Sequence, residues 1–185
     1  RLRGGSVEEA LEVMRKANDE LGLNIKYWSI GNEPALYPDY DTKKYNQEWR
    51  VIAEAMKEMY PEIVLIGPDI TQFTGNPETD PTDENGLLWM DEFLKVNGDL
   101  VDIISIHRYP FPISMISEPA TASELYASAA EWDKIIPALR NKTLEITGKD
   151  LPLAVTEVNS HWTNAYSLEA SPDSFANAIW WADVL

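Results

Sequence analysis

Two glutamates stand out because each directly follows a predicted β-strand. Glu33 follows the apolar and aromatic segment 25–30, in a turn of sequence Gly-Asn-Glu-Pro. Glu157 follows the apolar segment 153–156. In a pair of carboxyl groups, one can donate a proton to a leaving group while the other, ionised, attacks the reacting carbon. The two glutamates therefore predict an acid/base and nucleophile pair if their strand ends meet at one edge of a sheet.

Polar residues also follow the two other predicted strands. Asp69 comes after the segment 63–66, and His107 and Tyr109 come after the segment 100–106. A lone acidic residue after a strand is most often the cap of the next helix, and this is our interpretation of Asp69. His107 and Tyr109 are candidates for lining a site formed with the two glutamates.

The elements that must position these residues alternate regularly along the chain. Predicted strands begin near residues 25, 63, 101 and 153, and the segments around them have helical periodicity. Capping boxes at Ser6–Glu9 and Thr121–Glu124 predict two helix starts. We expect Pro137 to kink or divide the long helix after Thr121, and Ser171 to cap the last helix. This alternation predicts a parallel sheet with right-handed crossovers.

Two α/β architectures have this order of elements. A doubly wound sheet is one, but no glycine-rich phosphate loop follows any predicted strand. The other is a parallel (β/α)8 TIM barrel, which has eight strands and typically about 250 residues. Four strands in 185 residues correspond to about half of such a barrel. We therefore favour a TIM-barrel fragment and expect residues 1–185 to form a single partial domain, truncated at both ends.

Composition excludes several classes of partner and chemistry. Fifteen Lys and Arg residues against 31 Asp and Glu residues give a net charge of −16, which repels phosphate backbones and anionic lipid headgroups. We expect no nucleic-acid partner and no membrane partner. The absence of cysteine excludes a thiolate nucleophile, a disulfide framework and a cysteine zinc site. No signal peptide is evident, and the sequence does not distinguish a secreted protein from a cytoplasmic one.

The segments Trp28–Pro34 and Val155–Glu157 together resemble the retaining glycoside hydrolases of the large (β/α)8 clan. In that clan an acid/base glutamate ends strand four in an Asn-Glu-Pro turn, and a nucleophilic glutamate ends strand seven. Two predicted strands separate the two glutamates here, as in the clan. Within the clan, the sequence of these segments is most similar to the β-xylosidase, α-arabinofuranosidase and endoglucanase-like families. The resemblance implies that this chain is a partial catalytic domain containing strands four to seven.

The resemblance also implies a function and a role for individual residues. The expected enzyme is a retaining glycosidase that cleaves β-linked or arabinofuranosyl plant-type polysaccharides or oligosaccharides. Glu33 would be the general acid/base and Glu157 the nucleophile, and Asn32 would donate to the sugar 2-hydroxyl. The individual roles of His107 and Tyr109 stay open, and the loop aromatics either stack on sugar rings or pack within the protein. The residues expected to bind substrate are Asn32, His107, Tyr109, Trp162 and Tyr37.

The expected partners are a carbohydrate substrate and the missing barrel strands of the full-length chain, with no cofactor and no metal. Two alternatives remain open. Glu33, Asp69, His107 and Glu157 are also suitable ligands for Mg²⁺, Mn²⁺ or Zn²⁺, as in a metal-dependent barrel enzyme. A carbohydrate-binding barrel without turnover is the second alternative.

Overall fold

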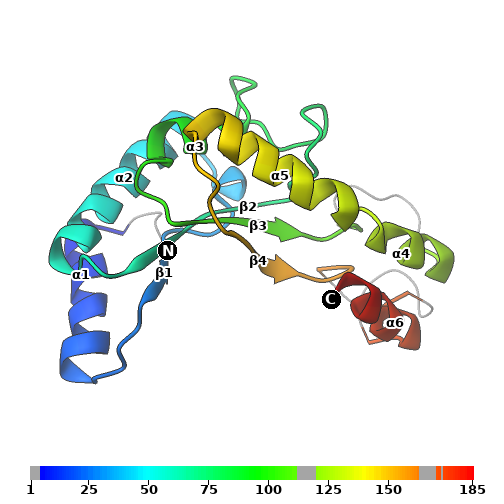
Figure 1. Cartoon of the computed structure of the whole chain (residues 1–185), viewed down its shortest axis with the longest axis horizontal. Coiled ribbons are helices and arrows are strands. Elements are labelled where there is room, and N and C mark those ends of the chain that lie inside the picture. Colours follow the sequence, from blue (N-terminus) through cyan, green and yellow to red (C-terminus); the bar gives the residue numbers. More distant parts are fainter. Residues whose placement is uncertain (1–4, 112–119, 163–169, 172) are drawn as a thin grey trace.

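The computed structural model describes residues 5–111, 120–162, 170–171 and 173–185, and within these ranges it contains one parallel sheet (Figure 1). The strands pair in the order β1-β2-β3-β4, which is also their order along the chain. A doubly wound sheet reverses its strand order at a switch point, whereas a barrel does not. The strands are β1 Tyr27–Ser29, β2 Val64–Ile70, β3 Ile103–Arg108 and β4 Leu153–Val158.

Helices connect successive strands, and three of them, α2, α3 and α5, lie along one side of the sheet (Figure 1). Both predicted capping boxes are present, at Ser6 before α1 and at Thr121 before α4. A π-helical turn, Lys16–Glu20, extends α1, and a 3₁₀ turn, Pro34–Leu36, follows β1. The helices are α1 Val7–Arg15, α2 Thr42–Met59, α3 Trp89–Asn97, α4 Ala122–Ala129, α5 Trp132–Thr147 and α6 Phe175–Val184.

Two predicted helix boundaries are wrong. The long helical region divides at residues 130–131, and Pro137 lies inside α5, where it does not divide the helix. The last helix begins after Ser174, whose side chain accepts from the Asn177 N–H, and not after Ser171. The prediction of a serine cap is therefore correct in residue type but wrong in position, because more than one serine in this segment can cap a helix.

The main core lies between the sheet and the helices α2 and α3. Trp49 of α2 packs edge-to-face on Phe93 of α3, with ring centroids 5.0 Å apart. Gly67 of β2 makes this possible, since a Cβ there would lie 3.1 Å from Phe93 and 3.3 Å from the Trp49 indole nitrogen. The buried Tyr45 hydroxyl donates toward the carbonyl oxygens of Ile30 and Pro68, 3.3 and 3.2 Å away. Helix α2 thereby supports the carboxyl ends of β1 and β2.

The outer edges of β1 and β4 have no partner strand among the described residues. Tyr27 on β1 is 62% exposed, and Val155 on β4 is 37% exposed. A parallel sheet is normally covered on both faces, so this exposure is unusual for apolar strand residues. It agrees with the prediction of a barrel fragment.

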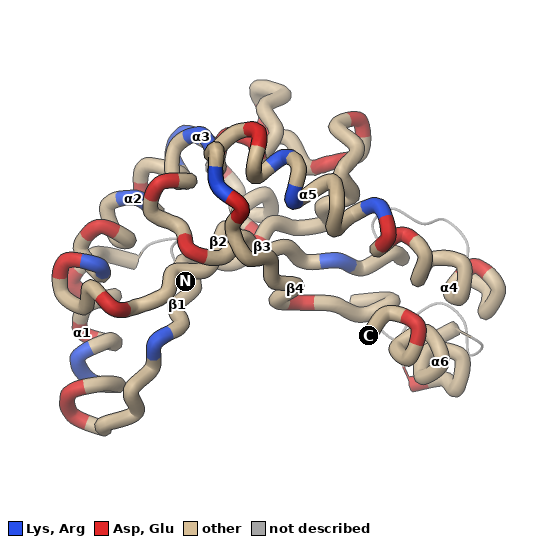
Figure 2. The backbone as a smooth tube through the Cα atoms, in the orientation of Figure 1, with Lys and Arg blue, Asp and Glu red and all other residues tan. Residues whose placement is uncertain are grey.

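The charge is spread over the helices and connecting turns of the described backbone, with acidic residues well represented throughout (Figure 2). None of the helices in the described ranges is long and apolar enough to cross a membrane.

Candidate active site

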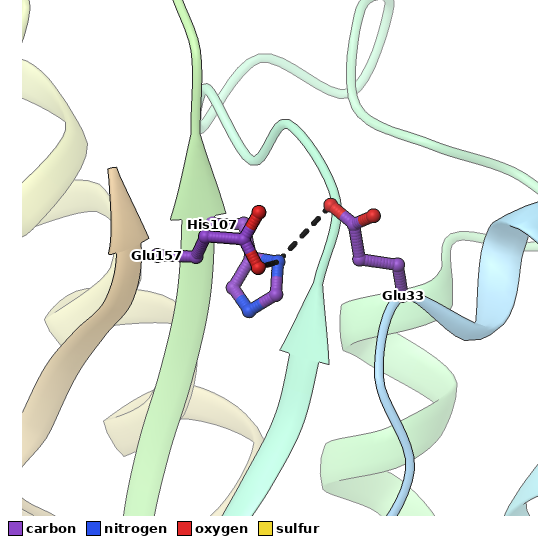
Figure 3. A group of neighbouring side chains, drawn as sticks. All are labelled: Glu33, His107 and Glu157. Atoms are coloured by element: carbon purple, nitrogen blue, oxygen red, sulfur yellow. Dashed lines mark hydrogen bonds and ion pairs between the residues drawn. The ribbon is translucent and has the colours of Figure 1, made fainter. Parts of the chain in front are cut away.

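The carboxyl ends of the four strands meet at one edge of the sheet, as predicted, and bring Glu33, His107 and Glu157 together. Figure 3 shows the two carboxyl groups reaching toward the imidazole ring of His107 from different elements. The His107 Nδ1 atom lies 3.0 Å from Glu33 Oε1 and 3.4 Å from Glu157 Oε2. One oxygen of each glutamate and a ring nitrogen of His107 all lie within 4.8 Å of one another.

Backbone geometry places Glu33 at this edge. Its φ is +48°, in the left-handed region, and its N–H donates to the Asp69 carbonyl oxygen at 3.1 Å. The neighbouring Asn32 N–H is 3.0 Å from the Tyr37 hydroxyl oxygen, which accepts the hydrogen bond. Positive φ at a residue other than glycine costs energy and persists at functional sites where surrounding contacts enforce it. Here strand β2 and the Tyr37 hydroxyl hold the turn.

Tyr109 hydrogen-bonds Glu157 directly, with its hydroxyl donating to Oε1. Burial and then the hydrogen bond to Glu157 raise the pKa of the Tyr109 phenol well above its usual value. The phenol therefore stays protonated and remains a donor to Glu157. A donor at this position stabilises the ionised carboxylate and fixes its orientation.

Asp69 is not a helix cap, so the interpretation based on sequence is wrong. It is 5% exposed and lies within β2, where its carboxylate accepts from Ser29 Oγ on β1 and, at 2.6 Å, from Thr156 Oγ1 on β4. Its own N–H donates to Ser105 Oγ on β3 at 2.9 Å. Its carboxylate oxygen Oδ1 is 3.9 Å from His107 Nε2. Asp69 thus contacts all three other strands directly beneath the candidate site.

A cavity of about 690 Å³ opens above the two glutamates. Of the predicted site residues, Glu33, Glu157, Tyr109 and Trp162 line it, and the Trp162 side chain is exposed as an aromatic wall. His107 is 2% exposed and lies beneath the carboxyl groups, while the prediction that Asn32 and Tyr37 bind substrate stays a prediction. The remaining lining residues were not predicted: Ala35, Leu36, Thr71, Gln72, Thr79, Pro81 and Thr82.

Most of these unpredicted residues belong to the connection between β2 and α3, residues 71–88. Asp83 fixes this loop to α2, because its carboxylate accepts from the Thr42 N–H and hydroxyl at 3.0 and 2.8 Å. Burial raises the pKa of Asp83, but hydrogen bonds from Thr42, Leu87 and Asn85 outweigh burial and lower it overall. The cavity wall is therefore attached to the same helix that supports β1 and β2.

Two carboxylates and one imidazole also form a donor set that transition metals accept. Among the described residues, Glu33, His107 and Glu157 each offer one potential ligand atom close enough to the others to bind a single metal ion. The hydrogen bond between His107 Nδ1 and Glu33 satisfies the same atoms without an ion. The geometry therefore permits either a proton or a metal ion between these groups.

Solved structures similar to this chain are glycosidases with (β/α)8 barrels. The alpha-L-arabinofuranosidase from Thermotoga maritima, in complex with arabinose, has a TM-score of 0.70 and 20% identity, over 97% of this chain and 37% of that chain. The monomeric beta-xylosidase from Caulobacter crescentus CB15 has a TM-score of 0.63 and 17% identity, over 85% of this chain and 31% of that chain. The family 44 endoglucanase Cel44A from Clostridium thermocellum has a TM-score of 0.62 and 19% identity, over 96% and 42%.

These similarities establish the fold: four parallel strands with their helices form about half of a TIM barrel, as predicted. The chain spans between 31% and 42% of the length of these three structures. No curated protein sequence matches the chain. Residues 4–123, which are more than half of the chain, match the alpha-L-arabinofuranosidase 1 domain. The resemblance to barrel glycoside hydrolases is thereby confirmed, and the chain belongs to the alpha-L-arabinofuranosidase 1 domain family.

Proposed function

We propose that the site belongs to a retaining glycoside hydrolase, with Glu33 as general acid/base and Glu157 as nucleophile. The observation that supports this most directly is the approach of the two carboxyl groups, whose nearest oxygens lie within 4.8 Å. Retaining enzymes hold their two carboxyl groups about 5–5.5 Å apart, and inverting enzymes about 6.5–9.5 Å apart to admit a water. The spacing in this chain is shorter than the range of inverting enzymes and close to that of retaining ones.

The proposed reaction has two displacements. Glu157 attacks the anomeric carbon and forms a glycosyl ester, while Glu33 gives its proton to the departing oxygen. Glu33 then removes a proton from water, which attacks the same carbon and releases Glu157. The Tyr109 hydroxyl orients Glu157 for the first step. His107 lies between both groups and holds Glu33 through the 3.0 Å contact.

The family suggests the substrate class to test first. The family takes its name from alpha-L-arabinofuranosidase, and arabinofuranosides are therefore the first candidates. Xylosides and β-glucans follow, because a beta-xylosidase and an endoglucanase share the fold. The exposed aromatic face of Trp162 is suited to pack on the apolar face of a sugar ring. We also propose that further strands pair with the outer edges of β1 and β4 and complete the cavity.

The stereochemistry of the first-formed product tests the proposal. Because a double displacement inverts the anomeric carbon twice, we expect the complete gene product to release a sugar of unchanged anomeric configuration. Proton NMR during the first minutes of hydrolysis distinguishes the two anomers before mutarotation brings them to their equilibrium ratio. An inverted product would remove Glu157 from the nucleophile role, and binding without hydrolysis would favour a carbohydrate-binding barrel.

The metal-dependent alternative rests on the ligand spacing of Glu33, His107 and Glu157. A glycosidase of the proposed type uses these carboxylates as proton donor and nucleophile, so removing metal ions is expected to leave its activity unchanged. The measurement is hydrolysis before and after dialysis against a chelator, with metal content determined by elemental analysis. Loss of activity on dialysis, restored by Mn²⁺ or Zn²⁺, would instead support the metal-dependent enzyme.

A further inference from the structure

Gln72 lines the same cavity as Glu33 and Glu157, but the proposed reaction gives it no role. It is the second residue after β2 and has a φ of +56°, in the left-handed region. Glycine or asparagine occupies such a backbone at lower cost than a longer side chain. The strained backbone presents a side chain whose amide group is at the cavity wall.

Two donors determine which way this amide is oriented. Arg108 Nη1 and the backbone N–H of Tyr109 both point at Gln72 Oε1, at 3.0 and 3.2 Å. An atom that receives two N–H donors must be the amide oxygen, because the amide nitrogen does not accept hydrogen bonds. The alternative, flipped orientation would place two N–H donors against an NH₂ group, so it is excluded.

An ion pair holds Arg108 in this position. Its Nε and Nη2 atoms donate to the two carboxylate oxygens of Glu131, at 2.9 and 2.6 Å, and the Arg108 side chain is 12% exposed. A two-pronged arginine–carboxylate pair fixes geometry more strictly than a single contact. Gln72 is therefore preorganised: its oxygen is used within the protein, and its NH₂ group has no partner among the described residues.

We propose that Gln72 is a substrate-binding residue whose amide nitrogen donates a hydrogen bond to a hydroxyl oxygen of the bound carbohydrate. This inference rests on the proposed function, since it assigns the ligand of that same cavity. The NH₂ group can only donate, so the partner must be an acceptor, and a neutral sugar hydroxyl fits a site whose carboxylates repel anionic ligands. A fixed donor costs little ordering entropy when the ligand binds.

A cycle between a protein variant and a substrate variant tests the inference in the complete gene product. Gln72→Ala is expected to raise KM about tenfold, with kcat within about twofold, because one hydrogen bond is lost in binding. The second half of the cycle uses substrates that each lack one hydroxyl. For one of them, the KM of wild type is expected to rise by the same factor relative to the parent substrate, whereas the KM of Gln72→Ala stays unchanged. If the KM increase from the missing hydroxyl and the KM increase from Gln72→Ala multiply for every deoxy substrate, the inference is overturned.

Gln72→Glu separates the donor from the structural contacts. A carboxylate keeps an acceptor oxygen for Arg108 and Tyr109, but its second oxygen can no longer donate. Fluorine in place of the partner hydroxyl also only accepts, so we expect this deoxyfluoro substrate to have about a tenfold higher KM with Gln72→Glu than with wild type. Equal KM values would contradict the donor role.

Gln47→Glu makes the same chemical change on an exposed position of α2 and is the matched control, expected to leave KM unchanged. Failure of the proposed function is recognised separately. If wild-type protein neither hydrolyses nor binds any carbohydrate tested, the site is not a glycosidase site and the inference falls with it. If wild type is active but Gln72→Ala has wild-type KM for every substrate, only the role of Gln72 is overturned.

Discussion

Glu157→Ala is expected to abolish turnover of every glycoside, whereas Glu33→Ala is expected to spare substrates with activated leaving groups. In the proposed reaction no other group can replace Glu157, because the glycosyl ester forms on its carboxylate, and the expected loss is roughly 10⁴-fold or more. In the proposed reaction Glu33 supplies a proton to the leaving oxygen, a contribution of about 10²–10⁴-fold. Nitrophenolates leave without that proton, so Glu33→Ala retains the first step on nitrophenyl glycosides.

Steady-state kinetics on a nitrophenyl glycoside and on a natural oligosaccharide make the comparison. Added azide is expected to accelerate the Glu33→Ala variant, because azide attacks the glycosyl ester without needing a general base. Tyr37→Phe and Glu48→Gln are not suitable controls, since both residues belong to the hydrogen-bonded region near the Glu33 turn. Glu145→Ala, on an outer turn of α5, is a suitable one. Equal losses on both substrates would show that Glu33 is not the acid.

Asp69→Ala is expected to lower both stability and activity, although Asp69 does not line the cavity. Removing its carboxylate takes away the acceptor of the Ser29 hydroxyl, leaves the Thr156 hydroxyl only its 3.5 Å contact with the Ile106 carbonyl oxygen, and opens a gap beneath His107. Both hydroxyls belong to exposed residues, so water can replace the lost acceptor and each lost hydrogen bond costs about 0.5–1.5 kcal/mol. The free energy of unfolding is therefore expected to fall by about 1–3 kcal/mol. Urea unfolding measures this loss.

Asp69→Asn distinguishes positioning from stability alone. Asparagine preserves the volume but has only one acceptor oxygen, so one of the two hydroxyls loses its acceptor. We expect kcat to fall with little change in KM, because losing one contact beneath the site changes how His107 lies against the two glutamates. Asp150→Asn, at an exposed ion pair with Arg140 at 3.7 Å, is the control and is expected to change stability by less than about 0.5 kcal/mol. A wild-type kcat in Asp69→Asn would argue against the positioning role.

The sequence was sufficient to predict the half-barrel and the meeting of Glu33, His107 and Glu157, because strand direction alone brings parallel strand ends to one edge. It was not sufficient for Asp69. The partners of its side chain are hydroxyls 40 and 87 residues away, and Ser29 and Thr156 have no local feature that marks them.

Gln72 was missed for a related reason. Its proposed role depends on the orientation of an amide, which Arg108 determines from 36 residues further along the chain. Local signals were more reliable where the interaction itself is local. The capping boxes at Ser6 and Thr121 each join residues three apart, and both are present. The residues of the connection between β2 and α3 that line the cavity follow from tertiary contacts, which no local pattern marks.

The contacts around Asp69 and His107 also have a consequence for the order of folding. Glu33 and His107 are 74 residues apart, and Asp69 and Thr156 are 87 apart, so the site is built from contacts that are distant in sequence. Such contacts carry a large loop-closure cost and form late. During synthesis the site therefore cannot assemble until Glu157 has left the ribosome and β4 has paired with β3. A mechanism-based reagent that labels Glu157 would thus report the completion of this half of the barrel, and the ability to react would appear after most of the helices had formed.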